Sequence, residues 1–452
     1  MSNTNLFDAF NPVSAKEWKQ KIQFDLKGAD YNETLIWESL EGIKLKPFYH
    51  ADETNEKAIP TNNSGWSIGQ VLYAGNAALA NKKAKSMLQM GVESFHFAIP
   101  SNRIKIEELL AGISIEKLPI YFDFQFLDSD YIKSILQFVG DKKDTIHLNI
   151  DLLDNLGRRG NWYKNLKDDH EQLDTILKLN VPNTIAVDMH HYQNAGANMV
   201  QQLGYALAHG NEYLNHTQGK ATNVTFKVAV GTNYFFEIAK LRALRLLWQT
   251  LASEYGVALD CNIIATPTRR NKTLYDYNTN MLRTTTECMS AILGGANMVC
   301  NMSYDAIYHK ENDFGNRIAL NQLLLLKNES YFDKVNDASA GTYYIEEITS
   351  QLAEKALLLF KQIEKGGGFL KYLKENRIQK KIKESAAKEQ KLFDDNEEVL
   401  VGTNQYVNTA DKMKDTIELY PFVKKNTRKT VIVPIIEKRL AEAIEQNRLD
   451  DE

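Results

Sequence analysis

Two adjacent histidines, His190 and His191, end the apolar run NTIAVDMHH and are placed where a catalytic side chain would be. A histidine at a strand end can act as a general acid or donate a hydrogen bond to a substrate carbonyl. Adjacent strand side chains point to opposite faces, so only one of the two is expected to face a site, which argues against joint metal binding. The alternative is a hydrogen-bonded structural histidine.

Four other residues have a type and a position that could serve chemistry. Asp151 and Asp305 lie at expected strand ends, and Thr266 ends a further expected strand. A carboxylate in such a position can equally cap the next helix or pair with an arginine. Arg283, in NMLRTTTE, is expected to form a buried ion pair rather than to bind a substrate. The residues alone therefore indicate a possible site without an assigned reaction.

The elements that must position these residues form a regular alternation between residues 66 and 305. Eight β-rich runs alternate with amphipathic helical stretches, and the runs are SIGQVLY, VESFHFAI, LPIYFDFQF, TIHLNIDLL, NTIAVDMHH, NVTFKVAVG, LDCNIIAT and ANMVCNM. Strands alternating with helices predict βαβ units and a parallel sheet. The number and length predict an α/β fold with a TIM (β/α)8 barrel, whose chemistry lies at the carboxyl ends of the strands. An open doubly wound sheet is the competing fold, but no glycine-rich phosphate turn follows any strand.

Two further regions flank the predicted barrel. An N-terminal extension, residues 1–65, has Ser14 as the cap of a helix from Ala15 to about Leu26, with Gly28 as its stop. The polar stretch TNEKAIPTNNSG is predicted to connect it to the barrel. A C-terminal region, residues 306–452, is expected to be mostly helical. Its predicted helices are FGNRIALNQLLLLKNES, SQLAEKALLLFKQIEKGGG, FLKYLKENRIQKKIKESAAKEQKLF and PIIEKRLAEAIEQNRL.

Composition excludes several classes of protein. The 54 Lys and Arg residues against 58 Asp and Glu give a formal charge of −4, which provides no electrostatic footprint for nucleic acid or an anionic membrane. No apolar run reaches the roughly 18 residues of a membrane-spanning helix, and the N-terminus has no secretory pattern. Cys261, Cys288 and Cys300 lack paired spacing, so neither a disulfide framework nor a zinc site is expected. A cytoplasmic location is predicted.

Several long stretches resemble one family, that of methylmalonyl-CoA mutase. The stretches FKVAVGTNYFFEIAKLRALRLLWQTLASEYG and YDYNTNMLRTTTECMSAILGGANMVCNMSYD resemble its sixth strand and helix and its seventh helix and eighth strand. HYQNAGANMVQQLGYALAHGNEYL, LKGADYNETLIWESLEGIKLKPFY, DASAGTYYIEEITSQLAEKA and VGTNQY are also similar. The resemblance is collinear and extends from about residue 14 to 440. It implies adenosylcobalamin chemistry on a barrel, with coenzyme A threaded along the barrel axis and cobalamin held by a separate domain with a DxHxxG motif.

The sequence departs from the catalytic pattern of that family at several places. No cobalamin-binding domain is expected in this chain, and Asp188-Met189-His190 lies in a barrel strand with Gln193 where the motif requires glycine. The family's RGYDSD segment, with a tyrosine that touches substrate and cofactor, is replaced by AIPSNRIKIEE. The TGTIQND segment, with the arginine that binds the substrate carboxylate, is absent. Losing that arginine would leave a buried carboxylate unpaired, at a cost of a few kcal/mol.

The remaining departures affect the seventh and eighth strands. NIIATPTRR replaces RTHCQTSG, so Ile264 and Thr266 occupy the positions of the substrate-binding His and Gln. An Asp-Glu pair becomes Asp305-Ala306, without the glutamate that faces the cofactor. His191 alone aligns with a catalytic histidine of the family, and its tyrosine neighbour is His190. His191 is therefore a vestigial candidate, and no residue of this chain is assigned to catalysis, cofactor binding or metal binding.

The resemblance and the departures together predict a non-catalytic small (β) subunit of a heterodimeric mutase that interconverts (R)-methylmalonyl-CoA and succinyl-CoA. Adenosylcobalamin is expected on the large (α) subunit, which is the predicted partner. The N-terminal extension, with the aromatic residues Phe7, Phe10, Trp18 and Trp37, is expected to wrap around that partner. One alternative is a catalytic acyl-CoA mutase barrel that works with a separate cobalamin-binding subunit. The other is a freestanding acyl-CoA-binding protein.

Overall fold

The computed structural model describes residues 7, 9–53, 59–61, 65–219, 223–258, 260–424 and 427–452. Most of the polar stretch between the N-terminal extension and the barrel lies outside the described residues, as does Leu259 at the start of the seventh predicted strand.

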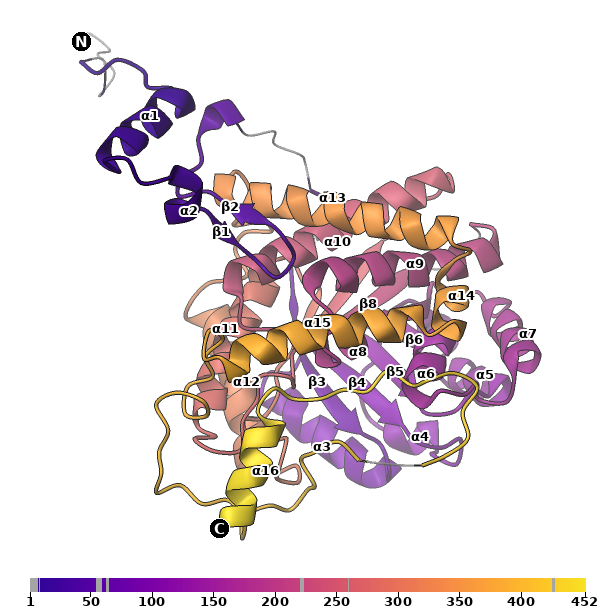
Figure 1. The fold of residues 1–452 in the computed structure, drawn as a ribbon. Coiled ribbons are helices and arrows are strands. Elements are labelled where there is room, and N and C mark those ends of the chain that lie inside the picture. Colours follow the sequence, from indigo (N-terminus) through magenta and orange to yellow (C-terminus); the bar gives the residue numbers. More distant parts are fainter. Residues whose placement is uncertain are drawn as a thin grey trace, which may run out of the picture.

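A closed barrel of parallel strands forms the centre of the molecule, in the order β10-β3-β4-β5-β6-β7-β8-β9 (Figure 1). The strands are β3 (Ser67–Tyr73), β4 (Ser94–Ile99), β5 (Ile120–Phe124), β6 (Ile146–Ile150), β7 (Asn183–Asp188), β8 (Val224–Val230), β9 (Cys261–Pro267) and β10 (Met298–Cys300). Each contains part of one of the eight predicted runs, so the predicted TIM barrel is confirmed.

Helices surround the barrel because every second strand residue is apolar and points outward. Phe95 and Phe97 of β4 and Val228 of β8 belong to one continuous core between the strands and the helices. These helices are α3 (Ala77–Gln89), α4 (Ile106–Leu109), α5 (Ser129–Val139), η2 (Gly140–Thr145), α6 (Leu152–Arg159), α7 (Leu166–Leu177), α8 (His190–Asn194), α9 (Met199–Thr217), α10 (Tyr234–Glu254) and α11 (Thr279–Leu293).

The C-terminal region is less helical than its sequence predicts. It contains α12 (Asp313–Asn328), α13 (Tyr343–Lys365), α14 (Phe369–Lys374), α15 (Arg377–Asp394) and α16 (Glu442–Asp451), and α13 packs against α9 and α10. The predicted single helix from Phe369 is broken in two because Asn376 adopts a left-handed conformation with φ 60°. The predicted helix starting at Pro434 is wrong in its first half, since α16 begins only at Glu442.

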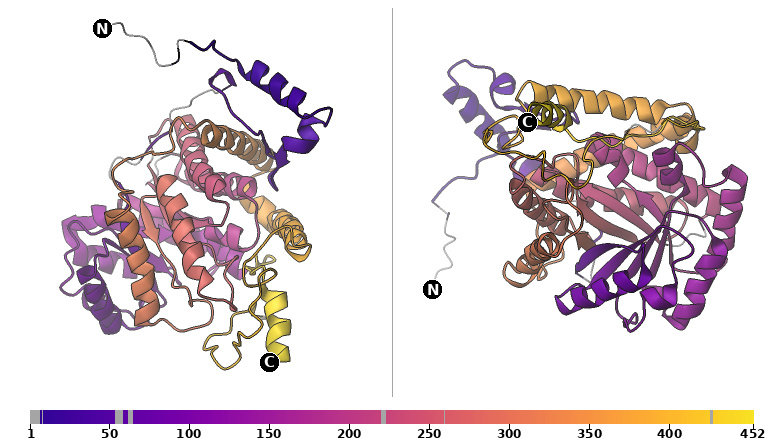
Figure 2. Two further views of the ribbon diagram at one scale, coloured as in Figure 1. Left: turned by 90° about the vertical axis from the view of Figure 1, so that its left-hand side faces the viewer. Right: turned by 90° about the horizontal axis from the view of Figure 1, so that it is seen from below.

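The N-terminal extension projects from the barrel, as Figures 1 and 2 show from different sides. It contains α1 (Ala15–Asp25), α2 (Tyr31–Leu35), the antiparallel pair β1 (Trp37–Glu38) and β2 (Lys44–Leu45), and the turn η1 (Ala51–Glu53). Ser14 caps α1 in a capping box with Glu17, as predicted for the cap. Trp18 stacks on Phe48 at 4.3 Å between ring centroids.

Candidate functional site

The carboxyl ends of the barrel strands, called the mouth below, carry a network of charges that cross the interior. Lys227 Nζ of β8 lies 2.7 Å from Asp188 Oδ2 of β7 and 3.0 Å from Asp123 Oδ2 of β5. Burial alone would lower the pKa of Lys227, but the Asp123 and Asp188 carboxylates raise it well above its ordinary value. Lys227 is therefore a paired ammonium and not an amine nucleophile, which requires a lowered pKa.

Arg158 of α6 joins the same network. Its Nε lies 3.2 Å from Asp154 Oδ2, its Nη2 lies 3.7 Å from Asp188 Oδ2, and the guanidinium also pairs with Glu437. Burial would raise the pKa of Asp188, but Lys227, His190 and Arg158 together hold it well below its usual range. Both cations are therefore already neutralised by carboxylates of the chain itself.

Sequence reasoning did not identify this network. The signal was present, because Lys227 interrupts the apolar run VTFKVAV and Asp123 interrupts IYFDF. A charged residue within a strand that is buried on both faces needs a partner inside the barrel.

His190 and His191 do not end a strand, which corrects the sequence-based placement. β7 ends at Asp188, and the two histidines begin the short helix α8. The His191 side chain is buried, with Nδ1 2.8 Å from Asp154 Oδ1 and Nε2 3.0 Å from the Ile435 carbonyl oxygen. Both ring nitrogens are thus occupied by the protein, and neither is left to donate to a substrate.

Asp151 caps a helix, which is one of the structural roles that its position in the sequence allows. Its carboxylate caps α6 by accepting a hydrogen bond from the Asp154 N–H at 2.9 Å. It also accepts hydrogen bonds from Tyr213 Oη and from the Asp188 N–H, and contacts His209 Nε2 at 2.8 Å. These contacts join α6, β7 and α9 behind the mouth, so the carboxylate is not available to a reacting group.

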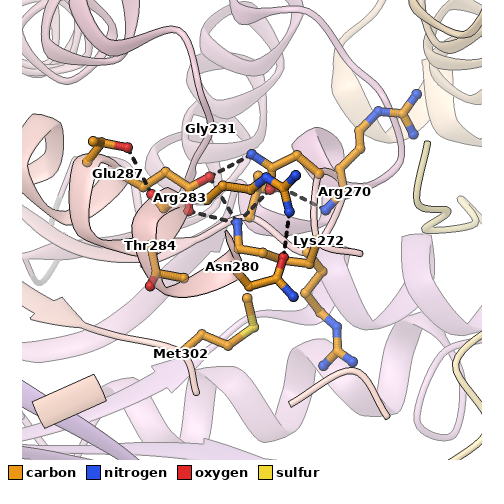
Figure 3. Close-up of polar contacts among 12 residues, drawn as sticks. Gly231, Arg270, Lys272, Asn280, Arg283, Thr284, Glu287 and Met302 are labelled. Carbon is orange, nitrogen blue, oxygen red and sulfur yellow. Dashed lines mark hydrogen bonds and ion pairs between the residues drawn. The ribbon is translucent and has the colours of Figure 1, made fainter. Parts of the chain in front are cut away.

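Of the other predicted residues, Thr266 of β9 and Asp305, which lies five residues beyond the end of β10, line one cavity, described below, and Arg283 is not part of it. Arg283 of α11 forms no ion pair among the described residues, contrary to expectation. It donates instead to Thr273 Oγ1, Asn280 Oδ1 and the Val401 carbonyl oxygen. Figure 3 shows Arg283 and Asn280 beside the buried pair Lys272–Glu287, whose nearest atoms lie 2.8 Å apart.

An extended stretch between Val431 and Leu440 crosses the mouth. Its backbone N–H groups donate to the carbonyl oxygens of Gly157 and Gly160 at the end of α6, of Asn194 at the end of α8, and of Arg270 in the loop after β9. Ile432 and Ile435 of this stretch are buried, whereas Val431 and Val433 are exposed. Side chains that are buried and exposed in turn are typical of an extended segment, and Pro434 cannot donate a backbone hydrogen bond. These residues are therefore extended, and the predicted helix does not form here.

The axis of the barrel is filled by side chains. Tyr121 of β5, Ile264 of β9 and Met298 and Cys300 of β10 form a buried cluster inside the strands. Asn262 Nδ2 of β9 donates to Tyr121 Oη at 3.3 Å across the barrel, because β5 and β9 are on opposite sides in the strand order. Gly69 of β3 packs so closely that a Cβ there would lie 2.6 Å from Met298 Cγ and from Cys300 Sγ.

Because two histidines are buried inside the barrel, we expect the free energy of unfolding to fall in acid. Burial lowers the pKa of His96 to about 4 and that of His147 to about 3. The unfolded chain binds protons on these groups below about pH 6.5, whereas the folded chain does not, so stability falls as the pH drops from 6.5 towards 4. We expect His147 alone to contribute about 3 kcal/mol to this loss, measured by urea unfolding at pH 7.5 and pH 4.

The variant His147→Phe, which keeps a ring against Tyr121, should lose correspondingly less stability over this pH range. His216→Phe is the matched control, because His216 is partly exposed and pairs with Asp174 at 2.6 Å on the surface. An unchanged pH dependence in His147→Phe would contradict the prediction.

No group of three or more His, Cys, Asp or Glu side chains among the described residues could hold a metal ion. Within the same residues, no helix is long and apolar enough to cross a membrane. Cobalamin does not fit the mouth as it is built here. The stretch from Val431 to Leu440 lies across it, and two cavities there, of about 450 and 470 Å³, each suit a small ligand rather than a corrin ring with a nucleotide tail.

Comparisons with known proteins point to one family. The profile of the family described as methylmalonyl-CoA mutase matches residues 142–448. The methylmalonyl-CoA mutase small subunit of Porphyromonas gingivalis is 33% identical over 457 residues, which cover 92% of this chain and 73% of that protein. The methylmalonyl-CoA mutase of Cereibacter sphaeroides is 28% identical, over 86% of this chain and 64% of its own length. This chain thus spans about two thirds of the latter relative.

A large subunit is also similar. The methylmalonyl-CoA mutase large subunit of Porphyromonas gingivalis is 31% identical over 248 residues, which cover 52% of this chain and 35% of that protein. The profile match covers more than half of the sequence, and the barrel has the strands that the resemblance implied. This chain belongs to the methylmalonyl-CoA mutase family.

Proposed function

We propose that this chain is the non-catalytic small subunit of a heterodimeric, adenosylcobalamin-dependent methylmalonyl-CoA mutase. The observation that carries the proposal is the filled barrel axis. If coenzyme A threads along the axis in catalytic barrels of this family, Tyr121, Ile264, Met298 and Cys300 occupy the path that it would need. Interiors packed in this way do not open for a ligand without rearrangement of the strands.

The chemistry of the mouth supports the same proposal. Lys227 and Arg158 are paired with carboxylates of the chain, and both nitrogens of His191 are occupied. Cobalamin, when bound to the partner, supplies the radical that rearranges the carbon skeleton. In this proposal the present chain holds no cofactor and stabilises the large subunit that does. Porphyromonas gingivalis has relatives of this chain that are named as a small and a large subunit, which supports a two-subunit arrangement.

A cytoplasmic location is part of the proposal. The three cysteines are free thiols, and burial raises the pKa of Cys261 to about 12, so that thiol is protonated and inert at neutral pH.

Co-expression with a large subunit encoded in the same genome tests this function. Size-exclusion chromatography should show a 1:1 complex, with the absorbance of cobalamin eluting with the complex and never with this chain alone. If this chain alone binds cobalamin, or turns over an acyl-CoA with a separate cobalamin-binding subunit, it is a catalytic barrel and the proposal is wrong. Tight binding of acyl-CoA esters by the isolated chain would instead identify a freestanding binding protein.

The variant His191→Ala separates a structural from a catalytic histidine. We expect the turnover of the reconstituted complex to change little. The free energy of unfolding of this chain should fall by about 1–3 kcal/mol, because Asp154 and the Ile435 carbonyl oxygen lose a buried partner. The control His216→Ala removes an exposed pair with Asp174 and should change stability by under about 1 kcal/mol. A large fall in turnover would show that His191 acts in catalysis.

A further inference from the structure

A cavity of about 450 Å³ lies on one side of the mouth and has no assigned role. Its walls come mainly from the middle of β3 and the end of β9, from the loop between β10 and α12, and from the first turn of α8. β9 and β10 are the seventh and eighth strands of the barrel. In TIM barrels the loops after these two strands frequently form a phosphate-binding site.

Two exposed cations, Arg269 and Lys310, line this cavity and have no ion-pair partner among the described residues. Neither the Arg269 guanidinium nor the Lys310 ammonium forms an ion pair or a side-chain hydrogen bond to any residue that the structure describes, although both line the cavity. This distinguishes them from Arg158, which lines the same cavity but is paired with Asp154 and Glu437. A guanidinium offers five donors in a planar fork, so an unpaired arginine suits an anion with two accessible oxygens.

A neutral donor completes the cavity wall. The Thr266 hydroxyl donates no hydrogen bond to the described part of the chain. It lines the same cavity as the two cationic groups, so a bound anion would give this hydroxyl a partner.

Each carboxylate in the wall is hydrogen-bonded or paired within the chain. Asp305 Oδ2 accepts from Asn312 Nδ2 at 2.7 Å. Glu311 pairs with Lys83 at 2.6 Å, and Glu437 pairs with Arg158. The wall carries three cations, Arg158, Arg269 and Lys310, and three carboxylates. Of these charges, Arg269 and Lys310 are the cations that have no ion-pair partner among the described residues, so an anion is expected to bind beside them.

We propose that this cavity binds a phosphate group, either as inorganic phosphate or on a small phosphate monoester, with Arg269 and Lys310 as the charged contacts and Thr266 as a neutral donor. Charge-assisted hydrogen bonds to phosphate are short and strong, and arginine makes them in pairs. The filled barrel axis separates the site from the opposite end of the barrel, so the ligand must be small enough for the cavity itself. The site does not depend on the proposed subunit role, because the full chain is expected to bind the anion by itself.

Isothermal titration calorimetry of the full chain tests the site, with inorganic phosphate and glycerol phosphate as the two probes and with ionic strength held constant by sodium chloride. Phosphate or the monoester should bind at one site, and the tighter of the two identifies the natural form of the ligand. Arg269→Gln should weaken binding at least tenfold, or about 1.4 kcal/mol, and Lys310→Gln should weaken it by a smaller factor. Arg103→Gln, which changes an exposed arginine outside the cavity, is the matched control and should bind as the wild type does.

Three results would overturn the assignment. They are the absence of phosphate and monoester binding at matched ionic strength, equal weakening in Arg103→Gln and Arg269→Gln, and binding of succinate as tight as that of either phosphate probe. Thermal unfolding of each variant without ligand shows whether it is folded. If Arg269→Gln does not fold, Lys310→Gln, whose side chain has no partner among the described residues to lose, decides the question.

Discussion

The variant Glu287→Leu is expected to lower the free energy of unfolding by about 3–5 kcal/mol, the usual cost of leaving one member of a buried ion pair unpaired. Glu287 of α11 and Lys272 in the loop after β9 are almost completely buried, with side chains 0% and 2% exposed. Lys272 Nζ lies 2.8 and 2.9 Å from the two carboxylate oxygens of Glu287. Burial lowers the pKa of Lys272 and raises that of Glu287, so each charge depends on the other.

The double variant Lys272→Met/Glu287→Leu should recover most of the loss, because a well-packed apolar pair of similar volume carries no desolvation penalty. Unfolding in guanidinium chloride measures the free energy of unfolding of the wild type, of Glu287→Leu and of the double variant. The matched control is Glu384→Leu, which removes an exposed pair with Lys381 at 2.7 Å and should change stability by under about 1 kcal/mol. If the double variant is as unstable as Glu287→Leu, then lost packing and not an unpaired charge causes the effect.

If this chain pairs with a large subunit as proposed, the second large effect is expected from the N-terminal extension. It carries exposed aromatic side chains that the barrel does not cover, and Phe10 and Phe24 are 74% and 78% exposed. Exposed aromatic residues on a projecting segment are typical anchors of a protein interface. We expect Phe24→Ser to weaken binding of the large subunit by about 2 kcal/mol, or roughly 30-fold.

Surface plasmon resonance with immobilised large subunit measures this affinity. Leu282→Ser is the control, because Leu282 of α11 is 71% exposed but lies on the barrel. Equal weakening by both substitutions would place the interface elsewhere. Unchanged affinity in Phe24→Ser would show that this side chain is not an anchor.

Much of the barrel could be predicted from the sequence because its strands are local patterns. The runs around Phe95, Ile120 and Val228 are short, apolar and followed by amphipathic helices, and each became a strand of the barrel. The cap at Ser14 and the stop at Gly28, which has φ 98°, were also local signals, since they depend on backbone groups close in the chain. The division of the chain into residues 1–65, 66–305 and 306–452 remains a prediction, as does the absence of a catalytic residue.

The sequence determined the fold class of this protein and its resemblance to the mutases, because periodicity and collinear motifs are properties of neighbouring residues. Only the tertiary structure decided that His191 binds Asp154 and the Ile435 carbonyl oxygen, residues 37 and 244 positions away. It also decided that Lys227 pairs across the barrel with Asp123, 104 positions earlier. Such contacts join elements that are distant in the chain, and in a closed barrel the side chains that meet on the axis are set by strand order and register rather than by sequence spacing.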